Sequence, residues 1–141
     1  GAPGASATEA APGAAAPTAP AGTAVVANQQ SASASLVALP GGATRHVEVG
    51  TGPHEAATGA DGRWAVVTVY GTREETGTRL ALLDLATGAL VRHVPLGEYT
   101  RPHGVVPLPG AGRRVVVTSE ASQRLLLVDL DRGAVEAAIP T

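Results

Sequence analysis

The strongest constraint on the fold of this chain is a repeat of about 50 residues in its second half. Segments 51–54 and 61–68 return as 100–103 and 111–118, and segments 80–85 and 87–88 return as 125–130 and 132–133. Each unit consists of short apolar runs separated by turns that contain glycine. Such periods are typical of repeat folds in which one unit cannot bury its own faces. The units must therefore stack to form a core.

Within the repeat, alternation with a period of two residues predicts short β-strands. They are expected at residues 23–28, 35–39, 45–49, 54–58, 63–70, 79–85, 90–96, 103–108, 113–118, 124–130 and 134–139, with a longer loop at 71–78. The runs 64–70 and 125–128 are almost continuously apolar, which indicates sheets that are covered on both faces. No long segment has a helical period. The predicted fold class is all-β, a β-propeller of four-stranded blades.

The strand count predicts only part of a propeller ring. Residues 23–50 supply three strands of an incomplete blade, and residues 51–97 and 98–141 supply one whole blade each. The partial β-propeller at 23–141 therefore has only about three blades, whereas closed propellers use about four to eight. The remaining blades are expected from a missing part of the chain or from self-association, and an incomplete sequence is favoured.

The first 22 residues have a different composition from the rest of the chain. Eighteen of them are Ala, Gly or Pro, which predicts a disordered leader or linker at 1–22. The sequence contains no Met, even at position 1, so the polypeptide is expected to be processed or excerpted from a longer one. Leaders of this composition are common after a cleaved export signal, which predicts a periplasmic or secreted protein.

Composition also excludes several functions. The net charge of −2 argues against a nucleic-acid-binding surface, which needs a dense basic patch. No run approaches 18 apolar residues, so no membrane span is expected. The chain has no Cys, and all ten of its basic residues are Arg. Thiol catalysis, thiolate metal sites and catalytic lysine chemistry are therefore excluded.

Three segments resemble the repeat of YVTN-type (YncE-like) β-propeller proteins. They are residues 25–28 with 36–39, residues 53–68, and the turn at 82–88. The resemblance extends over 23–141 and implies a seven-bladed propeller, usually exported in bacteria and mostly without a demonstrated reaction. The last unit departs from the family pattern, because Ala111 replaces the usual turn Asp and two prolines interrupt its first strand.

The best candidates for a functional site are two histidines that each follow a proline. His54 and His103 begin the first strand of each complete unit, and that strand is expected to be innermost and to line the channel. Imidazoles from successive blades could bind copper or zinc, or an anionic ligand if protonated. The alternative is that each histidine caps its strand. Glu55 and Arg101 flank this channel mouth and could shape the same rim, or they could be ordinary solvated charges.

Other polar residues suggest structural roles. His46 and His93 are expected to be exposed on the outermost strands. Asp84 and Asp129 precede glycine turns and are expected to hydrogen-bond within them. A calcium site in the loop at 71–78 is not favoured, because its two glutamates lack the spacing of a calcium loop.

The function favoured by the sequence is a non-enzymatic scaffold that binds an unknown small molecule or protein through its channel mouth and top loops. No cofactor is predicted, although copper or zinc at His54 and His103 stays open. One alternative is a lactonase-like hydrolase, of whose site His54, His103, Glu55 and Arg101 would form a part. Another is an accessory protein of a metal or quinone redox system.

Overall fold

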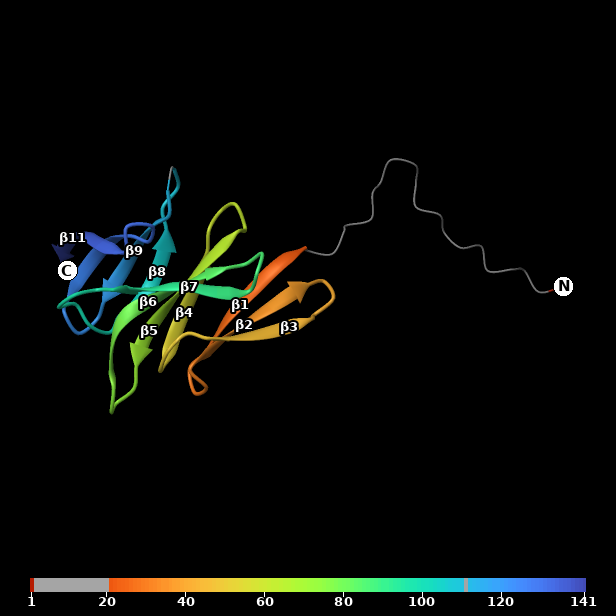
Figure 1. The fold of residues 1–141 in the computed structure, drawn as a ribbon, viewed down its shortest axis with the longest axis horizontal. Helices are drawn as coiled ribbons and strands as arrows, with labels where there is room; N and C mark the ends of the chain where they lie inside the picture. Colours follow the sequence, from red (N-terminus) through yellow and green to blue (C-terminus); the bar gives the residue numbers. More distant parts are fainter. Residues whose placement is uncertain (2–20, 111) are drawn as a thin grey trace.

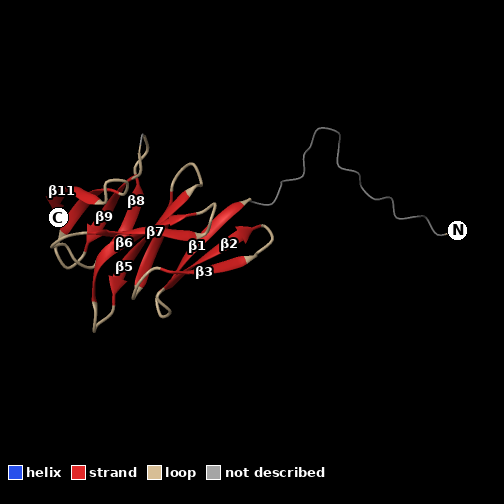
Figure 2. Ribbon diagram, viewed as in Figure 1, coloured by secondary structure: helices blue, strands red, loops and turns tan. Residues whose placement is uncertain are grey.

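The computed structural model describes residue 1 and residues 21–110 and 112–141, and all of its regular structure is β-strand (Figures 1 and 2). Residues 2–20 of the predicted leader lie outside the described residues. The first sheet contains β1 (Gly22–Asn28), β2 (Ser33–Leu39) and β3 (Thr44–Glu48). The second contains β4 (Pro53–Thr58), β5 (Trp64–Gly71), β6 (Thr76–Asp84) and β7 (Ala89–Pro95). The third contains β8 (Pro102–Pro107), β9 (Arg114–Ser119), β10 (Arg124–Asp129) and β11 (Ala134–Pro140).

Each sheet is an antiparallel meander in which consecutive strands pair. The three sheets follow one another in chain order across the molecule, and the second lies between the other two (Figure 1). The prediction of an all-β fold built from stacked four-stranded sheets is therefore confirmed. The described residues form no helix that is long and apolar enough to cross a membrane.

The second sheet is buried on both faces, as its continuous apolar run predicts. Alternate residues of β5 and β6 point to opposite sides, because side chains of a strand alternate. One set packs against the third sheet and includes Trp64, Val66, Leu80 and Leu82. The other set packs against the first sheet and includes Ala65, Val67, Val69, Ala81 and Leu83. Two continuous cores therefore join the three sheets.

The repeat in sequence is a repeat in structure. The carboxylates of Asp84 and Asp129 each accept two backbone N–H hydrogen bonds from the following turn, at 2.8–3.0 Å. These bonds confirm the predicted turn role, and they lower the pKa of both aspartates because the charged form accepts the bonds. The register also shifts at matching places, between Leu82 and Leu83 and between Leu127 and Val128.

The first strands of the two four-stranded sheets, β4 and β8, lie against each other. β8 also packs on β5 of the preceding sheet, and β4 packs on β1 in the same way. β1 therefore corresponds to β5 rather than to β4. The starts of β4 and β8, where the two Pro-His pairs lie, are consequently neighbours at one end of the stack.

Two sequence predictions are wrong. Half of the loop expected at 71–78 is strand, because β5 continues to Gly71 and β6 begins at Thr76. A four-residue turn joins them and is closed by a hydrogen bond from Thr72 N to Glu75 O of 2.7 Å. His46 is exposed as predicted, but His93 is half-buried, with Nε2 2.8 Å from the carbonyl of Val49, which directly follows β3.

Candidate functional site

The candidate site begins with the irregular starts of β4 and β8. The pairing of β4 with β5 shifts between Pro53 and Ala56, and the pairing of β8 with β9 shifts between Pro102 and Val105. A bulge of this kind re-aims the side chains within it. The structure brings the two predicted histidines together, with the ring centroids of His54 and His103 4.0 Å apart and their planes tilted by 41°.

Glu55 adds a carboxylate to the imidazole pair. Its Oε1 lies 3.5 Å from Nδ1 of His103, and 43% of its side chain is exposed, compared with 38% for His103. The contact joins residues of two sheets, since Glu55 lies on β4 and His103 on β8. Three of the residues predicted to form the channel mouth are therefore in one cluster that is open to solvent.

One ring nitrogen of the cluster has no partner. Nδ1 of His54 is buried and makes no hydrogen bond within the described part of the chain. The predicted alternative, that the imidazole caps its strand, is therefore not seen for this nitrogen. A buried polar atom without a hydrogen-bond partner costs about 1–3 kcal/mol, so the binding of a group that supplies such a partner is favoured there.

A buried threonine holds the backbones of the cluster in place. The hydroxyl of Thr68 on β5 accepts a 3.0 Å hydrogen bond from Glu55 N and donates a 2.9 Å bond to the His103 carbonyl. Thr68 is completely buried, so water does not compete for these bonds. Sequence reasoning missed this residue, although its recurrence as Thr118, which accepts from Gly104 N at 2.8 Å, marks the position.

Tyr70 and Glu120 were also missed and form one wall of the cluster. The Tyr70 ring lies 5.4 Å from the ring of His54 and 5.8 Å from that of His103. The Tyr70 hydroxyl donates a hydrogen bond to the Glu120 carboxylate. This bond raises the pKa of Tyr70, because the neighbouring carboxylate stabilises the protonated phenol and opposes a second negative charge.

Arg101 lies beside the cluster, but its guanidinium is bound to the protein. Nη1 donates to the carbonyl of Thr72 at 2.6 Å and to that of Tyr70 at 3.3 Å, and the guanidinium carbon lies 5.2 Å from the Tyr70 ring centroid. The backbone of Arg101 has a φ of 56°. Its N–H donates to Gly77 O at 2.9 Å, so the extended β5–β6 hairpin fixes the segment that leads into β8.

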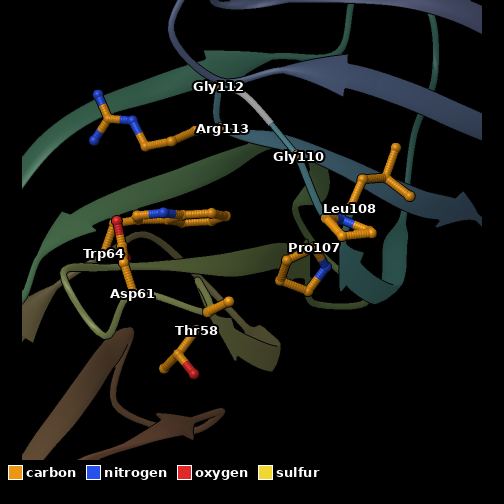
Figure 3. Close-up of a pocket in the computed structure, with 10 residues that line it drawn as sticks. Thr58, Asp61, Trp64, Pro107, Leu108, Gly110, Gly112 and Arg113 are labelled. Carbon is orange, nitrogen blue, oxygen red and sulfur yellow. The ribbon is translucent and has the colours of Figure 1, made fainter.

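A separate pocket of about 520 Å³ lies at the opposite ends of β4 and β8 from the cluster (Figure 3). It is formed by the turns that follow β4 and β8, and it is lined by Thr58, Ala60, Asp61, Trp64, Pro107, Leu108, Pro109, Gly110, Gly112 and Arg113. Figure 3 shows the Trp64 indole extending toward Pro107. The Arg113 side chain is paired with the Asp131 carboxylate at 2.6 Å. The pocket is therefore mainly apolar, with little free charge.

Comparisons with known proteins bear on the fold. No protein-family model matches the chain, and no curated protein sequence matches it. Among solved structures, hydrazine synthase of Kuenenia stuttgartiensis is similar, with a TM-score of 0.69 and 21% sequence identity over 83% of this chain. That protein contains β-propeller domains. The match covers 33% of the hydrazine synthase chain, so the present chain spans about a third of that length. At this identity the likeness shows the fold alone.

Proposed function

We propose that this protein is a non-catalytic binding scaffold whose ligand site is the cluster at the starts of β4 and β8. The observation that supports this most strongly is the convergence of His54, His103 and Glu55 from two sheets, together with the unpartnered Nδ1 of His54. Imidazole nitrogens without partners bind either a metal ion or a hydrogen-bonding ligand. The bound molecule is a small ligand or an exposed group of a partner protein.

The rigidity of the cluster supports a binding role. Thr68 and Arg101 fix the backbones that carry the cluster through hydrogen bonds, and the aromatic wall of Tyr70 is held by Glu120. A site whose backbone is held in place before binding loses less conformational entropy when the ligand binds. The backbone of the site is therefore preorganised, and only the ligand-binding side chains need to adjust.

The hydrolase alternative is less well supported by the geometry. Hydrolysis of a lactone requires a donor that stabilises the oxyanion in addition to a general base. The pair of His103 and Glu55 could act as a base, but the guanidinium of Arg101 already donates to two backbone carbonyls. The cation closest to the cluster is therefore used to hold the structure together.

We also propose that the chain belongs with YVTN-type propeller proteins and that a further blade covers its third sheet. The outer face of that sheet is apolar and includes Val106, Val116, Leu125, Leu127 and Ile139. The repeat aligns these residues with Ala57, Val66, Leu80, Leu82 and Val94, which pack in the core between the second and third sheets. Because the third sheet covers this face of the second sheet, we expect a further sheet to cover the equivalent outer face of the third.

Histidine NMR with four probes tests the proposed site. The imidazole resonances of the full chain would be followed during additions of zinc sulfate, sodium phosphate, sodium acetate and δ-valerolactone. The proposal expects at least one probe to shift His54 and His103 while His46 is unaffected, without turnover of the lactone. Absence of a selective shift with all four probes would overturn it, and so would lactone hydrolysis that is lost in a His54→Ala/His103→Ala double variant.

A further inference from the structure

We infer that the ligand of this cluster is a divalent transition-metal ion of the zinc or copper type, bound by His54, Glu55 and His103. The inference rests on the proposed function, because it names the ligand of the same site. One ligand atom from each of these residues lies within 4.8 Å of the other two. They are the only such group of three metal-binding side chains in the described part of the chain.

The donor chemistry selects the class of metal. Two imidazole nitrogens and one carboxylate oxygen suit zinc and copper(II), whereas calcium and magnesium require oxygen ligands. Zinc bonds to nitrogen and oxygen are about 2.0–2.2 Å long, so the donor atoms of a formed tetrahedral site lie roughly 3.2–3.6 Å apart. A present separation of 4.8 Å therefore has to close by roughly 1.2–1.6 Å when the ion binds.

The side chains can make this adjustment, because the backbones are fixed and the donor groups are not. Thr68 anchors both backbones, while the side chains of Glu55 and His103 are about two-fifths exposed, so solvent surrounds part of each donor group. The buried Nδ1 of His54 has no hydrogen bond to break. Rotation of three side chains is thus sufficient to assemble the site.

The charges around the cluster also favour a cation. Glu55 and Glu120 contribute two carboxylates, and Arg101 contributes one guanidinium. Attraction of a divalent ion by this excess of negative charge is stronger at a half-buried rim than in bulk water. Three protein ligands also leave a fourth position open on zinc, where a water molecule or an anionic ligand binds.

Isothermal titration of the metal-stripped full chain with zinc sulfate tests the assignment. The expected result is one zinc ion per chain, with no binding of magnesium under the same conditions. His54→Ala, His103→Ala and Glu55→Gln should each weaken zinc binding by at least the 10- to 100-fold typical of losing an outer-shell partner. His46→Ala is the matched control and should leave the affinity unchanged.

Two outcomes would overturn the assignment. One is the absence of stoichiometric zinc binding, and the other is an equal loss of affinity in His46→Ala and His54→Ala. Far-UV circular dichroism and the fluorescence of Trp64 establish that each variant folds. If a variant does not fold, the assignment is tested with the histidine NMR spectrum of the wild type. Zinc should then shift the imidazole resonances of His54 and His103 and leave those of His46 unchanged. A shift with phosphate or acetate but not with zinc would refute the metal and leave the proposed binding site standing.

Discussion

The repeat provides a test of sheet stacking in which the same substitution is made at two equivalent positions. Leu82 on β6 and Leu127 on β10 occupy matching places at matching register shifts. Leu82 is completely buried between the second and third sheets, whereas Leu127 is only partly buried on the outer face of the third sheet. Replacing each by alanine removes the same atoms from two different environments.

The expected losses follow from this difference in enclosure. Three buried carbons are worth about 0.8 kcal/mol each, so Leu82→Ala loses roughly 2.4 kcal/mol of transfer free energy. The cavity that remains between two sheets adds about 1 kcal/mol, for a total near 3–4 kcal/mol. At Leu127 water enters the space and no closed cavity forms, so only about half of the transfer free energy is lost, roughly 1–1.5 kcal/mol.

Urea unfolding followed by the fluorescence of Trp64, the single tryptophan, measures both variants. With a typical urea dependence of about 2 kcal/mol per molar, the midpoint of Leu82→Ala should lie about 1 M below that of Leu127→Ala. Equal losses at low protein concentration would refute the reasoning, because Leu127 would then be as enclosed as Leu82.

Three further predictions concern single groups. Thr68→Val should lower the unfolding free energy by about 1–3 kcal/mol in urea titrations, because a buried N–H and a buried carbonyl lose their partner. Gly59→Ala places a Cβ 2.2 Å from the Trp64 indole and should cost about 1–3 kcal/mol and shift the tryptophan emission. The lowered pKa of Asp84 stabilises the fold fully above the unfolded pKa of about 3.9, and this stability is lost as the pH falls through the folded pKa. Acid titrations should therefore show a weaker pH dependence of unfolding for Asp84→Asn.

Matched variants control these predictions. Thr118 is exposed and only accepts from Gly104 N, so Thr118→Val should cost less than Thr68→Val. Gly41 has open space around its Cβ position, so Gly41→Ala should leave the fluorescence unchanged. Equal effects within either pair, or the same acid dependence for Asp84→Asn and the wild type, would contradict the corresponding structural argument.

The parts of the fold that depend on local sequence patterns can be predicted from the sequence. The apolar run of β5 indicates burial on both faces, and Asp84 with its glycine turn predicts the hydrogen bonds that are found. The loop at 71–78 was expected because the repeat is longer at this point and insertions commonly fall on loops, but the extra residues partly extend the β5–β6 hairpin. In the structure, Gly77 is required where a Cβ would lie 1.9 Å from the Val69 carbonyl of the paired strand.

The candidate site is only partly predictable from sequence. His54 and His103 stand out because the Pro-His pair recurs. Tyr70 and Glu120 do not, since their hydrogen bond joins residues 50 apart, one on β5 and the other in the turn that follows β9. Their separation equals one repeat, so the stacking of equivalent strands is the signal that could have found them. The environment of His93 was missed for the same reason, because its partner, the Val49 carbonyl that directly follows β3, lies 44 residues earlier in the chain.

The central claim is that two repeated Pro-His pairs build one metal site between β4 and β8. Anomalous diffraction at the zinc absorption edge, from crystals of the full chain grown with zinc sulfate, tests it most directly. The predicted result is a peak about 2.0–2.2 Å from a nitrogen of His54, a nitrogen of His103 and an oxygen of Glu55. Zinc at His46 or His93 with no peak at the cluster, or no ordered zinc at all, would contradict the claim.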